Sequence, residues 1–309
     1  MPDRLGRRAV LKFGFGGLIG VAAVGVGGVE LVDHGVLPGK QLLDRLDGAC
    51  SVPVPSLVFA PTGPSFSGAF YSAARRRTVG YTVAYPPGHR PGDELPLIVA
   101  LHGYGGDHRR VLTRMSLAQA LALRVGGRQL PPMAIVAADG GGGYWNPHPG
   151  DDPLGMVIDE LIPRCQARGL GRPGGSRRIG TIGISMGGYG AILLAEKHPE
   201  LFGAVAAIGP AIWTSYAQAR AVNEGAYVSA AAFAAADAVT HARALARVPV
   251  RLASGTDDPF HPGVEALVEV LPPGAVVDIA RGCHTGSFFA QQEPASLEFL
   301  ARHIAGSES

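Results

Sequence analysis

The chain has 309 residues, 47% of them hydrophobic, which is enough to bury one large core or two smaller ones. Its formal net charge is only +2 and no basic block lies beyond the extreme N-terminus, so we expect no nucleic-acid partner. Its three cysteines, Cys50, Cys165 and Cys283, lack C-x-x-C spacing, so we expect no zinc or other metal site. Two states fit the sequence equally well, namely one disulfide with one free thiol, or three free thiols.

The N-terminal residues 1–29 have the features of an export signal. Arg7 and Arg8, followed by an apolar residue and Leu11-Lys12, resemble the bacterial twin-arginine signal, and the glycine-rich run 13–29 has the low hydrophobicity of such signals. We therefore expect the twin-arginine export machinery as a partner and a folded part outside the cytoplasm. The run 13–29 is at the short limit for spanning a bilayer. No A-x-A cleavage site follows it, so release and retention as a membrane anchor both stay open.

After this signal, residues 30–74 are punctuated by Pro, Gly and Ser, and we expect a spacer or a covering arm there. From 75 to 305 we expect a single α/β domain, because apolar runs with strand composition alternate with helical patterns. The strands are predicted at 78–85, 97–101, 133–137, 179–184, 204–208, 248–253 and 275–279. Such alternation is typical of a mostly parallel sheet flanked by helices.

Two glycine-rich loops follow the early strands. His102-Gly103-Tyr104-Gly105-Gly106 lets the backbone approach a substrate, and we assign the N–H of Tyr104 to an oxyanion hole. His102 either lines the substrate pocket or, as a histidine beside such a loop does more often, braces the loop by hydrogen bonding. The second loop, 139–146, fits no phosphate-binding pattern, and we expect it to be mobile and to present Tyr144 and Trp145 to a pocket.

The segment 183–190 reads Gly-Ile-Ser-Met-Gly-Gly-Tyr-Gly and lies between an apolar strand pattern and a helical one. Strand, G-x-S-x-G and helix together are typical of a nucleophile elbow, in which Ser185 is raised above the sheet edge. Gly183 and Gly187 remove Cβ atoms that would clash in such a sharp turn. The first helical N–H, that of Met186, would be the second donor of the oxyanion hole.

An alanine-rich region, about 213–247, contains Trp213 and is long enough for a helical lid over the strand ends. We expect Trp213 to line the substrate pocket, while plain crossover helices would explain the region equally well. Cys165 belongs to an apolar stripe at helical spacing and is therefore expected in the core.

A serine nucleophile needs a base and an acid that orients the base. Asp258 and His284 both follow predicted strands downstream of Ser185, in the chain order of α/β-hydrolases. We prefer Asp258 to its neighbour Asp257, which we expect to brace the turn. We prefer His284 to His261, because His284 follows the last strand and has small neighbours.

Together these motifs resemble the putative-esterase family of α/β-hydrolases, which includes esterase D (S-formylglutathione hydrolase), feruloyl esterases and mycolyltransferases. The residues that carry the resemblance are Leu101-His102-Gly103, Asp139-Gly140, Asp159-Glu160-Leu161-Ile162-Pro163, the segment 183–190, Gly255-Thr256-Asp257-Asp258-Pro259-Phe260 and Gly282-Cys283-His284. The resemblance covers roughly Val79 to Ile304 and implies serine-dependent ester hydrolysis or acyl transfer without metal or cofactor. An aspartate acid resembles the esterase D branch, whereas mycolyltransferases resemble a Ser-Glu-His arrangement, which argues against mycolyl transfer.

We therefore expect an exported serine carboxylesterase that acts on a small-molecule or lipid ester and is secreted or held at the cell membrane. One alternative is a cell-envelope acyltransferase that uses the same residues. Another is a catalytically silent hydrolase fold that serves as an envelope binding protein.

Overall fold

The computed structural model describes residues 50–53, 62–114, 117, 121, 124–125, 128–171 and 179–305. These residues belong to a compact unit that spans Gly48–Ser309. The predicted export signal, with its apolar run 13–29, lies outside the described residues. Within the described ranges, no helix has the length and apolar character needed to cross a membrane.

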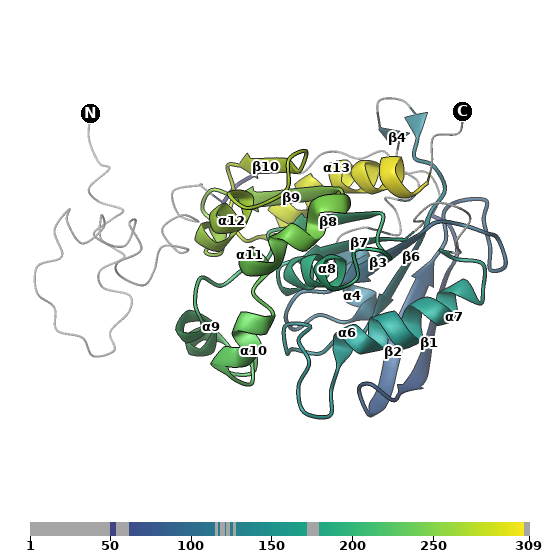
Figure 1. The fold of residues 1–309 in the computed structure, drawn as a ribbon. Helices are drawn as coiled ribbons and strands as arrows, with labels where there is room; N and C mark the ends of the chain where they lie inside the picture. The colour runs from purple at the N-terminus through teal and green to yellow at the C-terminus, as the bar shows by residue number, and fades with distance from the viewer. Residues whose placement is uncertain are drawn as a thin grey trace, which may run out of the picture. The chain divides into compact units, whose positions relative to one another are not determined.

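An eight-stranded sheet forms the centre of this unit (Figure 1). Its strands are β1 (Ser65–Ser72), β2 (Arg77–Ala84), β3 (Leu97–Leu101), β6 (Ala134–Ala138), β7 (Ile179–Ile184), β8 (Ala204–Ile208), β9 (Val250–Gly255) and β10 (Val276–Ala280). They lie in the order β1-β2-β6-β3-β7-β8-β9-β10. Strands β1 and β2 run antiparallel to their neighbours, and all other pairs are parallel. The predicted mostly parallel sheet is thus confirmed.

The outer strand β1 corrects the predicted domain boundary. It pairs with β2 along its whole length, from Ser65 opposite Ala84 to Ser72 opposite Arg77. The sheet therefore begins at residue 65, inside the range 30–74 that the sequence suggested as a spacer. β1 lacks an apolar run because most of its side chains are exposed at the sheet edge. A hairpin of two short strands, β4 (Arg124–Val125) and β5 (Arg128–Gln129), stands apart from the main sheet.

Both faces of the sheet are covered, which explains the continuous apolar strands. Successive side chains of a strand point to opposite faces. In β3, Leu97, Val99 and Leu101 accordingly join one core cluster, whereas Ile98 and Ala100 join the other. The first cluster includes residues of α8 (Met186–Lys197) and α7 (Ile162–Gln166). The second includes residues of α4 (His108–Arg114) and the long C-terminal helix α13 (Gly286–Ile304).

Pro163 changes the helix that the apolar stripe predicts. The stripe is divided into α6 (Pro153–Gly155), a π-helical segment η1 (Met156–Leu161) and α7. Because proline cannot donate a backbone hydrogen bond, the wider π-turn accommodates it without ending the helix. Cys165 lies in the core as expected.

The predicted insertion between β8 and β9 is helical. It contains α9 (Tyr216–Val222), α10 (Ala230–Ala235), α11 (Ala238–His241) and the 3-10 helix η2 (Ala242–Arg247). α11 and η2 pack on α8, as crossover helices do, whereas α9 and α10 lie beyond them in the direction away from β9 and β10 (Figure 1). A lid function for this insertion stays a prediction. The last helix before β10 is α12 (His261–Val268).

Candidate active site

Ser185 occupies the sharp turn between β7 and α8. Its backbone has φ 55° and ψ −124°, which non-glycine residues rarely adopt. A Cβ atom at Gly183 would lie 2.0 Å from the carbonyl oxygen of Gly187, and one at Gly187 would lie 2.0 Å from that of Leu101. The glycines are therefore required by close backbone approach, and the segment has the geometry of a nucleophile elbow.

Three side chains from the carboxyl ends of β7, β9 and β10 meet in one hydrogen-bonded row. Ser185 Oγ lies 2.8 Å from His284 Nε2, and His284 Nδ1 lies 2.7 Å from Asp258 Oδ2. A carboxylate can only accept, so Nδ1 carries the proton and Nε2 is free to accept from the serine hydroxyl. The imidazole is thereby held in the tautomer that a general base needs.

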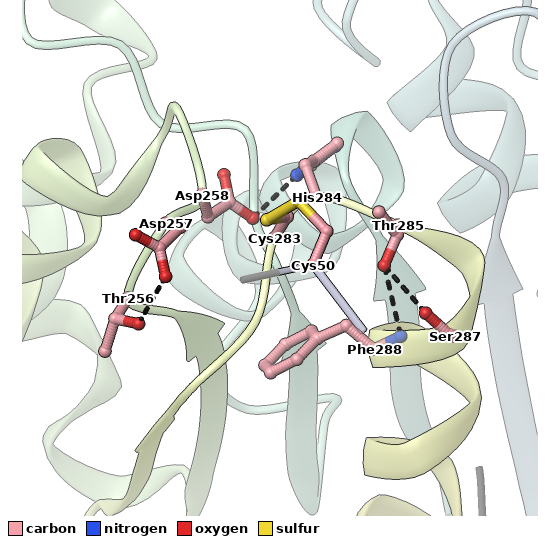
Figure 2. The surroundings of a disulfide bond; sticks show 9 residues. All are labelled: Cys50, Thr256, Asp257, Asp258, Cys283, His284, Thr285, Ser287 and Phe288. Carbon is pink, nitrogen blue, oxygen red and sulfur yellow. Dashed lines mark hydrogen bonds and ion pairs between the residues drawn. A yellow bond between two sulfur atoms is a disulfide. The ribbon is translucent and has the colours of Figure 1, made fainter. Parts of the chain in front are cut away.

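Burial and hydrogen bonds distinguish the two neighbouring aspartates. The Asp258 side chain has no exposed surface, and its Oδ1 accepts the N–H of Phe260 at 2.8 Å. Asp257 instead accepts from the hydroxyl of Thr256 at 2.9 Å, which fits the predicted bracing of the turn (Figure 2). The structure thus brings Asp258, the preferred candidate, to the histidine. His261 lies in α12 and pairs with Glu265, so it is not part of this row.

Two phenylalanines flank the imidazole of His284, and sequence reasoning missed both. The ring centroids of Phe260 and Phe289 each lie 5.0 Å from that of His284. The available signal was their place in the sequence, two residues after Asp258 for Phe260 and five residues after His284 for Phe289. Such packing restricts the rotation of the imidazole and keeps it between the serine and the aspartate.

Both assigned oxyanion donors belong to segments that adjoin the serine. Met186 is the first residue of α8, and the loop after β3 passes so close that a Cβ at Gly103 would lie 3.4 Å from Ser185 Cβ. Neither Tyr104 N–H nor Met186 N–H has a protein acceptor within the described ranges. Free N–H groups at a helix start and an adjacent loop are what a developing oxyanion requires.

His102 braces this loop, which was the second of its two predicted roles. The histidine is 1% exposed. Its Nε2 accepts the N–H of Gly140 at 2.9 Å, so its Nδ1 carries the proton and donates to the Gly103 carbonyl at 2.9 Å. Burial lowers the pKa of His102, which favours this neutral form.

The expectation that Trp145 lines a pocket is wrong. Its side chain is 0% exposed, and its Nε1 donates to the carbonyl oxygen of His102. The mobile loop predicted for 139–146 is instead folded around this indole. Tyr144 is also buried, and its ring packs near those of Tyr189, Tyr227 and Trp213.

Trp213 is 7% exposed, and its ring meets that of Phe260 edge-on at 4.8 Å. It therefore lies behind one of the rings that flank His284. A contact between Trp213 and substrate stays a prediction.

The structure also resolves the question of the cysteines. Cys50 and Cys283 form a disulfide across a sequence separation of 233, and Cys165 is free and buried. Burial raises the pKa of the Cys165 thiol to about 12, so it stays protonated and unreactive. The second member of the disulfide directly precedes His284.

Comparison with known proteins identifies the family. The family model described as "Putative esterase" matches residues 72–272, well over half of the chain. The chain belongs to the putative esterase family. This esterase matches no curated protein sequence. Its α/β-hydrolase fold is shared with a ferulic acid esterase (18% identity, TM-score 0.67, covering 79% of this chain and 100% of that one).

Two further solved structures resemble this esterase at a similar level. An S-formylglutathione hydrolase from Agrobacterium tumefaciens is 20% identical with a TM-score of 0.62, covering 82% of this chain and 100% of that one. The Mycobacterium tuberculosis protein MPT51 is 21% identical with a TM-score of 0.60, covering 78% and 99% of the two chains. At this identity the structures establish the fold, and the family match establishes an esterase-family hydrolase.

Proposed function

We propose that this esterase is a serine carboxylesterase whose acyl-enzyme forms on Ser185. The observation that carries the proposal is the continuous hydrogen-bonded row from Ser185 through His284 to the buried Asp258, with the serine on a nucleophile elbow. The serine hydroxyl alone is a weak nucleophile, and this row supplies both the base and the group that orients it.

The geometry supports the following reaction. Ser185 Oγ attacks the ester carbonyl carbon while its proton passes to His284 Nε2, and the carbonyl oxygen becomes negatively charged. The N–H groups of Met186 and Tyr104 stabilise that oxygen, and one such donor is typically worth roughly 3 kcal/mol of the barrier. The imidazolium then protonates the leaving alcohol as the C–O bond breaks. A water molecule, deprotonated by the same nitrogen, releases the carboxylic acid from Ser185.

A fluorophosphonate probe and a panel of esters test this proposal. The wild-type protein should be labelled and should hydrolyse p-nitrophenyl esters, and Ser185→Ala should lose both properties while keeping its fold. Labelling of the Ala variant would show that the nucleophile is another residue. Absence of labelling in the folded wild type would instead support a silent binding protein.

The panel also identifies the substrate. It contains short to long acyl chains, methyl ferulate and S-formylglutathione, since the last two correspond to the ferulic acid esterase and the S-formylglutathione hydrolase that share this fold. Added glycerol or trehalose distinguishes hydrolysis from transfer, because an acyltransferase would place the acyl group on the added alcohol. We favour hydrolysis by water, and a majority of transferred product would overturn that preference.

We further propose that the protein is exported by the twin-arginine route. Support comes from Arg7-Arg8 before the apolar run 13–29 and from the Cys50–Cys283 disulfide, since such bonds persist mainly outside the cytoplasm. Replacing both arginines with lysine should leave the protein in the cytoplasmic fraction. An unchanged distribution between fractions would contradict this route.

A further inference from the structure

We infer that the Cys50–Cys283 disulfide is a positioning device for His284, so that the esterase reaches its full turnover only when this bond is oxidised. The inference rests on the proposed function, because it concerns the base of that reaction. It adds Cys50 and Cys283 to the residues that control the rate, although Cys50 lies far from the catalytic row in sequence.

The first observation is the proximity of the bond to the base. Cys283 is 4% exposed and is covalently bound to Cys50 with a Cα–Cα distance of 4.9 Å, and the next residue is His284. Figure 2 shows the disulfide that joins Cys50 to Cys283 on the loop that carries His284. A displacement of Cys283 therefore moves the backbone of His284 directly, with no flexible residue between them.

The second observation concerns the other contacts of this loop. Gly282 accepts the N–H of Asp257 at 2.9 Å, and Thr285 accepts the N–H of Phe288 at the start of α13. Between these two points, in the described part of the chain, no backbone hydrogen bond from another element reaches Cys283 or His284. Within the loop, the N–H of Thr285 donates to the Cys283 carbonyl at 2.8 Å. The disulfide is thus the covalent link between these two residues and a distant part of the chain.

The third observation is that the Cys50 side of the bond is itself anchored. Val52 packs against the core cluster that includes Phe288 and lies beside Gly282, where an added Cβ would come within 3.2 Å of its Cγ1. The short segment 50–53 therefore covers the back of the histidine loop. Because Val52 packs against this cluster, the Cys50 side of the disulfide has a contact of its own with the folded unit.

The physical consequence follows from the precision that catalysis demands. A displacement of about 1 Å in a catalytic group can cost on the order of a hundredfold in rate. With the bond reduced, His284 would depend on its side-chain contacts with Ser185, Asp258 and two phenylalanine rings. We expect kcat to fall roughly tenfold or more, while KM changes little, because the group that reduction would displace is the base of the reaction.

The test uses the full chain and a dithiol reductant. Dithiothreitol transfers two electrons and two protons to the S–S bond, leaving thiols on Cys50 and Cys283, and becomes a cyclic disulfide. Titration with a fluorophosphonate gives the concentration of competent sites, so kcat can be stated per titrated site. The reduced protein should have a roughly tenfold lower kcat per site, and reoxidation with glutathione disulfide should restore it.

Two variants complete the test. Cys50→Ala/Cys283→Ala should resemble the reduced wild type and should no longer respond to reductant. Cys165→Ala removes a buried thiol elsewhere in the core and should keep full kcat per site and full sensitivity to reductant. If the double variant fails to fold, the reduced wild type still decides the question.

Two outcomes would overturn the inference, and they differ from a failure of the proposed function. A kcat per titrated site within twofold of the oxidised value would show that the bond only stabilises the fold. An unchanged kcat in a folded double variant would have the same meaning. If the oxidised wild type is not labelled at all, the proposed serine mechanism itself is wrong.

Discussion

Replacing Ser185 with glycine should give a more stable protein than replacing it with alanine. At φ 55° and ψ −124° an L-residue is strained by about 1–3 kcal/mol, and glycine is not. Both variants lose the hydrogen bond to His284 Nε2, so that loss cancels in the comparison. Glycine gives back roughly 0.5–1 kcal/mol because its unfolded chain is freer. The balance favours the glycine variant by about 1 kcal/mol.

Thermal unfolding of the two purified variants measures this difference. In a domain of this size, 1 kcal/mol corresponds to a rise of roughly 2–4 °C in Tm. Urea unfolding with equal m-values would show that the change lies in the folded state and not in the compactness of the unfolded chain. A glycine variant that melts at or below the temperature of the alanine variant would refute the reasoning, because the backbone at residue 185 would then not be strained.

Two further predictions concern carboxyl groups. Asp258→Asn should lower kcat/KM by several orders of magnitude, because the amide favours the wrong histidine tautomer. Asp257→Asn should keep kcat/KM within about threefold of wild type. Ester hydrolysis assays on both variants measure this, and the reverse order of the two effects would exchange the roles of the two aspartates. Burial, aided by nearby Asp237, raises the pKa of Glu196 from 4.5 to about 9. Between these two pH values the carboxyl group is neutral in the folded protein but ionised in the unfolded chain. The free energy of unfolding should therefore fall as pH rises from about 4.5 to 9. Glu196→Gln should therefore gain about 4 kcal/mol of stability relative to wild type between pH 5 and pH 8. Parallel pH profiles of the variant and the wild type in urea unfolding would contradict this.

Much of the sheet and the meeting of Ser185, Asp258 and His284 could be predicted from the sequence. Strands buried on both faces must be continuously apolar, so their runs are visible, and catalytic residues in this fold follow strands in a fixed chain order. Strand β1 escaped prediction because its exposed side chains need no apolar pattern. The register between distant strands brought the three side chains together, and only the structure shows that contact.

Features that depend on distant partners could not be read from local patterns. The pairing of Cys50 with Cys283 spans 233 residues, and no spacing rule connects them. The loop 139–146 was predicted to be mobile because its glycines suggest freedom when no partner is known. Its order depends on a buried indole and on Arg75, whose side chain donates to the Asp139 carbonyl and to Asp151.

That loop also bears on attempts to redesign the enzyme. A side chain at Gly140 would come within 2.3 Å of the Trp145 ring, and one at Gly143 within 2.5 Å of His148. Randomised libraries at these two positions would therefore mostly return misfolded clones. Tyr104, 65% exposed on the opposite loop, offers a site where new side chains can be accommodated. Diversity directed there can alter selectivity without dismantling the scaffold.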